Sequence, residues 1–250
     1  MRLLKNIYLV SGSMYGSHQN VYAVRCDDSI VLIDCGMGQK DYDIIQKNLA
    51  YWDLDTLPIS RILLTHAHCE HSGNAYRYRK LGARIAIHHS EAQAVETGND
   101  GTASYAFFHF EKYHTCSVDD RLTENDYIKQ GEFCFQVIHT PGHSRGCVVY
   151  ELKTENRIVL FTGDTLLADR LCLRSALGWT GAADYDQESY VNSLLLLSRR
   201  KADLVLPGHG EICMKEGERL LAGGHLRARL QLLTQPSQKI ETRNFFRERG

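Results

Sequence analysis

The sequence lacks the features that mark membrane-spanning, nucleic-acid-binding and disulfide-stabilised proteins. No stretch approaches the ~20 consecutive apolar residues that a membrane-spanning helix needs. The formal net charge of −1 provides no electrostatic attraction to nucleic acid or to an acidic membrane surface. The eight cysteines include no Cys-x-x-Cys pair and show no regular spacing. These absences favour a small molecule as the partner, and we expect neither nucleic acid nor membrane binding.

The cysteines and the N-terminal segment indicate a reducing compartment. Residues 1–10 carry basic side chains but have too short an apolar run for a signal peptide. Thiols in apolar strand-like runs, such as Cys134 and Cys147, are expected to be buried as small hydrophobes rather than paired in disulfides. We therefore expect a cytoplasmic protein.

Apolar runs and turn residues predict alternating strands and helices. Strands are expected at 6–10, 20–25, 29–33, 61–64, 84–87 and 204–206, with hairpins at 127–138 and 147–161. Helices are expected at 42–50, 71–81, 90–97, 187–200 and 215–233, the last weakened by its glycine pair. The stretch 99–116 is interpreted as a capping loop, with a substrate lid also compatible, and its rings are Tyr105, Phe107, Phe108, Phe110 and Tyr113.

What the sequence does contain is a dense group of metal-ligand side chains. One short segment holds three histidines and a carboxylate: His66, His68, Glu70 and His71. Three more such groups follow at long range, each directly after a glycine: His143, Asp164 and His209. Imidazole and carboxylate suit zinc and, to a lesser degree, iron or manganese. Glycine lets the backbone turn sharply and approach an ion closely. The set predicts a metal centre that does chemistry.

The pattern resembles the metallo-β-lactamase superfamily, whose signature is His-x-His-x-Asp-His followed at a distance by His, Asp and His. Every position matches except the motif aspartate, which is Glu70 here. The resemblance runs from Asp34-Cys35-Gly36 to the Pro-Gly-His-Gly segment at 207–210. It implies an α/β fold, a four-layer αβ/βα sandwich with the site at the edge between two sheets. We expect this catalytic domain at 1–212, with a C-terminal helix and tail at 213–250 packed on it or extending from it.

The resemblance also implies how the ligands are shared between two ions. The first ion would be held by His66, His68 and His143, and residues two apart on an extended stretch do point the same way. The second would be held by Glu70, His71 and His209, with Asp164 bridging both. Two zinc ions per chain are expected, with iron or manganese as alternatives. A metal-bound hydroxide would be the nucleophile.

Glu70 is the departure from the pattern that matters most. It keeps the charge but moves the carboxylate by ~1.5 Å, whereas metal–oxygen distances tolerate only ~0.2 Å. Either the loop adjusts, or the second ion binds weakly, or a different metal is preferred. The thiol of Cys69, between the ligands, is expected to face the helix rather than coordinate.

Two further residues are candidates for a part in the reaction, beside Glu70. The resemblance implies that Asp34 orients metal-binding groups without ligating, and the alternative is a turn residue. Tyr185 is a candidate for polarising a substrate carbonyl. His139, close to a ligand in sequence, is expected to pack or to support a ligand.

The expected reaction is hydrolysis of an ester-type bond in a small molecule, with a thioester or lactone favoured. The segment 183–190 looks most like the glyoxalase-II-like hydrolases, and arginines after His209 are compatible with an anionic substrate. A homodimer is compatible with the sequence. Two alternatives stay open. One is a mononuclear iron persulfide-type dioxygenase that uses His66, His68 and His143 or Asp164. The other is a degenerate, non-catalytic metal-binding protein.

Overall fold

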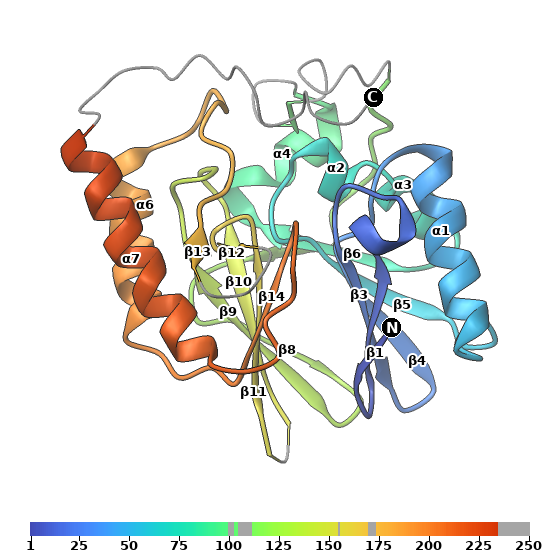
Figure 1. Cartoon of the computed structure of the whole chain (residues 1–250). Coiled ribbons are helices and arrows are strands. Elements are labelled where there is room, and N and C mark those ends of the chain that lie inside the picture. The colour runs from blue at the N-terminus through green and yellow to red at the C-terminus, as the bar shows by residue number, and fades with distance from the viewer. Residues whose placement is uncertain (100–102, 105–111, 155, 170–173, 235–250) are drawn as a thin grey trace.

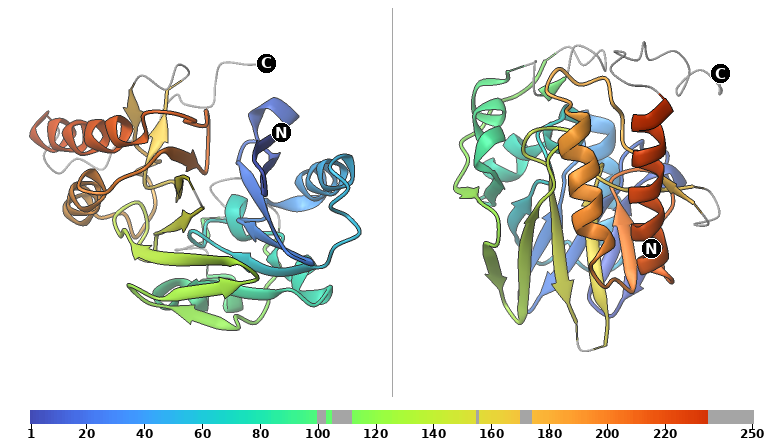
Figure 2. Two further views of the ribbon diagram at one scale, coloured as in Figure 1. Left: turned by 90° about the horizontal axis from the view of Figure 1, so that it is seen from below. Right: turned by 90° about the vertical axis from the view of Figure 1, so that its left-hand side faces the viewer.

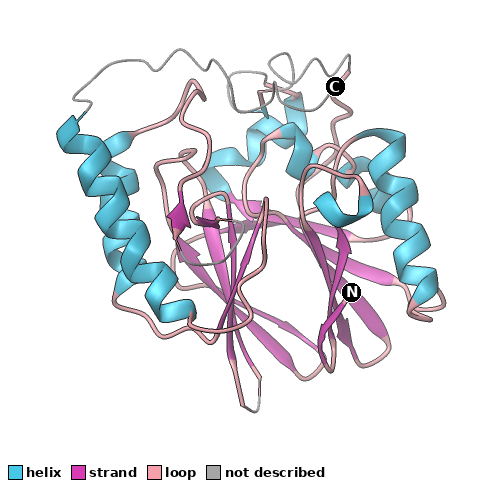
Figure 3. Cartoon of the chain, in the orientation of Figure 1, coloured by secondary structure: helices cyan, strands magenta, loops and turns pink. Residues whose placement is uncertain are grey.

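The protein is a sandwich of two β-sheets with helices on both outer faces. The computed structural model describes residues 1–99, 103–104, 112–154, 156–169 and 174–234. Figures 1 and 2 show the two sheets face to face, with α6 and α7 covering one side and α1 the other. Figure 3 separates the central strands from the outer helices. The predicted α/β class and four-layer sandwich are confirmed.

The first sheet has seven strands that pair in chain order. Its antiparallel half consists of β1 (Arg2–Leu4), β2 (Ile7–Ser11), β3 (Val21–Cys26) and β4 (Ser29–Ile33). Its parallel half continues from β4 to β5 (Ile59–Leu63), β6 (Arg84–His88) and β7 (Asp120–Leu122). The intervening helices are α1 (Gly38–Tyr51), α2 (Cys69–Ser72), α3 (Ala75–Lys80) and α4 (His89–Thr97). Parallel pairing brings the carboxyl ends of β4 and β5 to one edge.

The second sheet has five strands in the order β14-β11-β10-β9-β8. They are β8 (Tyr127–Gln130), β9 (Phe133–His139), β10 (Val148–Lys153), β11 (Ile158–Gly163) and β14 (Leu204–Pro207). A small two-stranded sheet joins β12 (Leu167–Ala168) to β13 (Ser175–Ala176). The outer helices are α6 (Gln187–Ser198) and α7 (Gly217–Thr234), and a short 3₁₀ turn, η1 (Ser13–Tyr15), follows β2.

Apolar side chains form three layers that match this arrangement. Tyr22, Tyr150 and Phe161 belong to the layer between the two sheets. A second layer lies under α1, α3 and α4, and a third, which includes Leu194 and Leu221, lies under α6 and α7. Strand residues alternate between the inner layer and an outer one, as a pleated strand buried on both faces requires.

One helix differs from its predicted form, and glycines make close contacts both there and in the last helix. The helix expected at 71–81 is split into α2 and α3. A Cβ on Gly73 would lie 2.5 Å from the carbonyl oxygen of Cys69. The next residue, Asn74, donates its backbone N–H to Gly36 rather than continuing the helix. The last expected helix is present as α7 with its glycine pair inside it, and Gly224 allows a close approach, because a Cβ there would lie 2.5 Å from Leu166 Cδ1.

The structure also shows which of the cysteines and of the aromatic residues in 99–116 are buried. The seven described cysteines are free thiols. Cys147 is buried, but Cys134 is exposed, because its neighbour Phe135 takes the inward face of β9. Tyr113 is buried, whereas Tyr105, Phe107, Phe108 and Phe110 lie outside the described residues. Among the described helices, none is both long and apolar enough to cross a membrane.

Candidate metal centre

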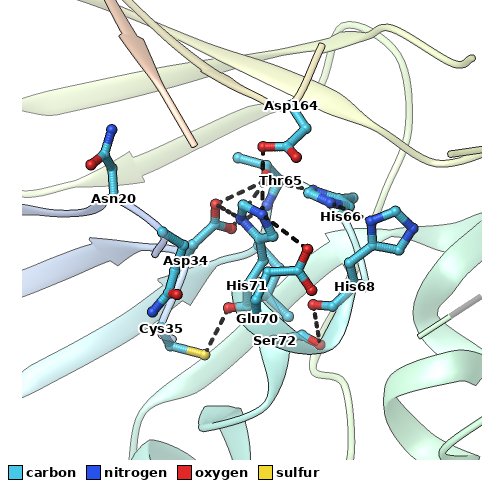
Figure 4. Close-up of polar contacts among 12 residues, drawn as sticks. Asn20, Asp34, Cys35, Thr65, His66, His68, Glu70, His71, Ser72 and Asp164 are labelled. Atoms are coloured by element: carbon cyan, nitrogen blue, oxygen red, sulfur yellow. Dashed lines mark hydrogen bonds and ion pairs between the residues drawn. The ribbon is translucent and has the colours of Figure 1, made fainter. Parts of the chain in front are cut away.

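The ligand-bearing segments meet at one edge of the sandwich because each follows the carboxyl end of a strand. The segment 65–71 follows β5, and Asp34 follows β4. From the second sheet, His143 follows β9, Asp164 follows β11 and His209 follows β14. The sequence-predicted metal ligands are therefore brought together from both sheets, where they form two groups. Figure 4 shows Asp164 approaching the 65–71 segment from the opposite sheet.

Three fully buried imidazoles form the first group, called the three-histidine group: His66, His68 and His143. His66 Nε2 and His68 Nδ1 lie 3.1 Å apart, and His143 Nε2 lies 3.3 and 3.1 Å from those two atoms. Nitrogens bound tetrahedrally to one zinc at ~2.05 Å would be ~3.3 Å apart. The spacing of the three nitrogen atoms is therefore that of a metal site.

The second group, called the mixed group, combines carboxylates with imidazoles: Glu70, His71, Asp164 and His209. His71 Nε2 lies 3.1 Å from His209 Nε2, 3.5 Å from Asp164 Oδ1 and 3.9 Å from Glu70 Oε1. Asp164 Oδ2 lies 3.4 Å from His209 Nε2 and 3.7 Å from His143 Nε2. Asp164 thus faces both groups. Glu70 points into the mixed group despite its extra methylene.

The protonation of these side chains suits a cation. Burial, followed by mutual repulsion among the imidazoles, holds the pKa values of His66 and His68 well below their usual range. Burial also lowers the pKa of His143. Neutral imidazole is the form that binds a metal. Asp164 Oδ1, which faces His71 in the mixed group, is buried and has no hydrogen-bond partner in the structure. A buried polar atom without a partner is costly, so the donor set fits a divalent ion.

His71 behaves differently because carboxylates surround it. Burial would lower its pKa, but the charges of Asp164 and Asp34 outweigh burial and raise the pKa to about 9. Burial raises the pKa of the Glu70 carboxyl. In the absence of metal, the mixed group therefore carries a proton at neutral pH, which a bound cation would have to displace.

Hydrogen bonds from outside the groups fix the orientation of the rings. Asp34 Oδ2 accepts from His71 Nδ1 at 2.9 Å, and Asp34 Oδ1 accepts from the Thr65 backbone N–H at 2.8 Å. The Thr65 hydroxyl donates to Asp34 and accepts from His66 Nδ1 at 3.0 Å (Figure 4). Asp34 has a φ of 61°, a left-handed conformation that Asp tolerates better than most residues. It contacts ligands and lies in neither ligand group.

Backbone carbonyls accept hydrogen bonds from the outer nitrogens of two more ligand imidazoles. His143 Nδ1 donates to Trp179 O at 2.7 Å, and His209 Nδ1 donates to His18 O at 3.0 Å. Such contacts set the tautomer and leave Nε2 free for the metal. Gly208 permits the close approach of the last segment, since a Cβ there would lie 2.5 Å from Asp164 Oδ1.

Several supporting residues were not predicted from the sequence. The buried Tyr190 hydroxyl donates to Asp164 O at 3.0 Å and accepts from Gly178 N at 2.8 Å, which ties α6 to the ligand loop. Trp179 acts through its carbonyl, for which the sequence offers no side-chain signal. Thr65 could have been found from its place directly before His66, because a hydroxyl there can reach the ring.

Three sequence candidates lie beside the two groups. The Tyr185 ring is 6.1 Å from that of Tyr190, edge to face, and packs on the apolar layer under α6, so its role in the reaction stays a prediction. Cys69 is buried and in neither group, and its thiol lies 3.8 Å from Met37 Sδ and 3.6 Å from Glu70 Oε2. His139 stacks on His88 with ring centroids 4.0 Å apart, which is a packing contact.

Known proteins resemble this chain in sequence. A family model described as "Metallo-beta-lactamase superfamily" matches residues 14–209. Acyl-coenzyme A thioesterase MBLAC2 of Homo sapiens is 28% identical over 215 residues, which cover 78% of this chain and 74% of the relative. The atrochrysone carboxyl ACP thioesterase of Aspergillus fumigatus is 25% identical over 201 residues, covering 80% of this chain and 53% of that protein.

Solved structures agree with these sequence relatives on the fold. BJP-1, a subclass B3 metallo-β-lactamase of Bradyrhizobium japonicum, superimposes with a TM-score of 0.75 at 22% identity, covering 94% of this chain and 93% of that one. At this identity the likeness concerns the fold alone. Since the family model spans most of the sequence and all of the ligand segments, the chain is a hydrolase of the metallo-β-lactamase superfamily.

Proposed function

We propose that the protein hydrolyses a thioester of a small molecule with the help of two divalent metal ions. The observation that carries the proposal is the pair of facing ligand groups joined by Asp164. The choice of a thioester is supported by the two thioesterase relatives. A lactone remains the second substrate class to test, and the glyoxalase-II-like branch remains a prediction.

The chain's own residues would divide the work of binding and proton transfer. Two zinc ions, when bound, supply a Lewis acid and lower the pKa of a coordinated water to about 7. The neutral rings of His66, His68 and His143 would hold the first ion. The mixed group would hold the second, and Asp164 would bridge the two. Iron or manganese remain the alternative metals.

Glu70 is proposed to bind the second ion and to accept the proton of the attacking water. Its Oε1 points toward His71, whereas Oε2 lies beside the Cys69 thiol. This orientation leaves one oxygen for the ion. In the metal-free protein, burial raises the pKa of this carboxyl, so it holds a proton more readily than an exposed carboxylate does.

The geometry favours this function over the two alternatives. A mononuclear iron dioxygenase would leave Glu70 and His71 idle, yet the ligand atoms of the mixed group lie within 4.8 Å of one another. A degenerate binding protein would require Glu70 to have lost its place, and its carboxylate still lies in the group. A cytoplasmic location, an anionic substrate and a homodimer remain proposals from the sequence.

Metal analysis and a substrate panel test the proposal together. Protein purified without added metal should contain about two divalent ions per chain and should hydrolyse acyl-coenzyme A thioesters. The matched control is His66→Ala, which should lose both metal and turnover. One iron per chain, or two zinc ions with no turnover of thioesters and lactones, would overturn the proposal.

A further inference from the structure

A buried carboxylate outside the ligand set lies next to the three-histidine group. Glu91 is in the first turn of α4 and has an exposed fraction of 0%. A carboxylate buried this deeply is unfavourable unless hydrogen-bond donors surround it. Among the described residues, Glu91 has no partner in an ion pair. Its stabilisation must come from neutral donors.

Three neutral donors surround Glu91, and they come from two separate ligand segments. Oε2 accepts the backbone N–H of Ala67. Oε1 accepts the hydroxyl of Ser144 and, at 2.7 Å, the backbone N–H of Gly146. A Cβ on Gly146 would lie 2.8 Å from Glu91 Cγ, so glycine is what allows this approach.

Two of these donors are next to metal ligands in the sequence. Ala67 lies between His66 and His68, and Ser144 directly follows His143. One carboxylate therefore ties together the two backbone segments that carry the three-histidine group. We propose that Glu91 is the positioning residue of the three-histidine group, fixing the 66–68 segment against His143. This inference rests on metal binding at that group, which belongs to the proposed function.

The chemistry of the site requires a carboxylate at this position. All three contacts need an acceptor, and both oxygens of a carboxyl group can accept in its ionised and in its protonated form. A glutamine would replace one oxygen by an NH₂ group, which would face at least one N–H or O–H donor. That mismatch would push the two segments apart while leaving the size of the side chain almost unchanged.

The test measures metal binding by the three-histidine group alone. In a His209→Ala background, which disables the mixed group, Glu91→Gln is titrated with Co²⁺ and with zinc against a competing chelator. We expect ~10–100-fold weaker binding, the range for residues that orient metal ligands, and an altered visible Co²⁺ spectrum. The matched control is Glu96→Gln on the same helix, which removes an exposed ion pair with Arg121 and should leave both readouts unchanged.

A second variant keeps the test decisive if Glu91→Gln does not fold. Ser144→Ala removes one of the three donors and should weaken metal binding in the same direction by a smaller factor. The inference is overturned if Glu91→Gln folds and its metal affinity and Co²⁺ spectrum are unchanged. If Glu91→Gln does not fold, the same result for folded Ser144→Ala overturns it. Wild-type protein that binds metal but turns over no thioester would overturn the proposed function and leave this inference standing.

Discussion

The two ligand groups of this protein are built on different principles. The three-histidine group is fully buried, uncharged and held by contacts to Thr65 and Trp179. The mixed group contains two carboxylates, a histidine whose pKa is raised, and His209, whose side chain is 26% exposed. Glu70, the one departure from the superfamily signature, lies in this second group. The first group is buried and uncharged, whereas the second is charged and reaches the surface only at His209.

The largest effect is expected from removing a ligand of the three-histidine group. His143→Ala should lower kcat/KM by more than ~100-fold, because even residues that only orient ligands cost ~10–100-fold when replaced. Elemental analysis should show a loss of at least one ion per chain. Unchanged metal content together with unchanged kcat/KM would show that His143 does not hold an ion. His139→Ala, which alters a histidine outside both groups, is the control.

The next effect is expected from the residue that serves both groups. Asp34→Asn should lower kcat/KM by ~10–100-fold, because the amide cannot accept from both Thr65 and His71. Metal content should fall in the mixed group more than in the three-histidine group, since only His71 contacts Asp34 directly. Chelator competition measures the loss of metal from each group. Equal loss from both groups would show that Asp34 does not act on the mixed group in particular.

A smaller effect is expected from restoring the signature residue. Glu70→Asp shortens the side chain and withdraws its oxygen by ~1.5 Å, in a loop that accommodates glutamate. We expect about tenfold weaker binding of the second ion and unchanged binding of the first, measured by stepwise zinc titration. Tighter binding of the second ion would mean that this loop is shaped for aspartate.

The smallest effect concerns stability as a function of pH in metal-free protein. Burial raises the pKa of Glu91 from 4.5 to about 7. The folded state thus keeps a proton that the unfolded state has lost, so the contribution of Glu91 to stability is full below pH 4.5 and is lost as the pH rises through about 7.

The matched variant isolates this contribution from that of the histidines. The free energy of unfolding of the wild type minus that of Glu91→Gln should fall as the pH rises across this window, with a slope of at most ~1.4 kcal/mol per pH unit. Denaturant titrations at several pH values measure it. A difference that is constant from pH 5 to pH 7 would show that Glu91 does not titrate there.

The residue types of the site could be read from the sequence, but its supports could not. A ligand such as His68 belongs to a local motif, whereas Glu91 reaches its segment only through the pairing of β5 with β6 and the packing of α4. Trp179 acts through a backbone carbonyl, which every residue has. The topology of the sheets came from the resemblance, because alternating strands and helices fit several folds. The break between α2 and α3 at Gly73 was not predicted, since the close contact of this glycine with Cys69 and Met37 depends on the tertiary fold.

The contacts of Asp34 have a consequence for how the protein takes up metal. This carboxylate contacts His71 of the mixed group directly and is linked to His66 of the three-histidine group through the Thr65 hydroxyl. An ion that orders His66 also orders Asp34 and hence His71. Binding of the two ions is therefore expected to be cooperative, and thermodynamic reciprocity makes the coupling equal in either order of addition. At limiting metal, half-loaded molecules should be fewer than two independent sites would give.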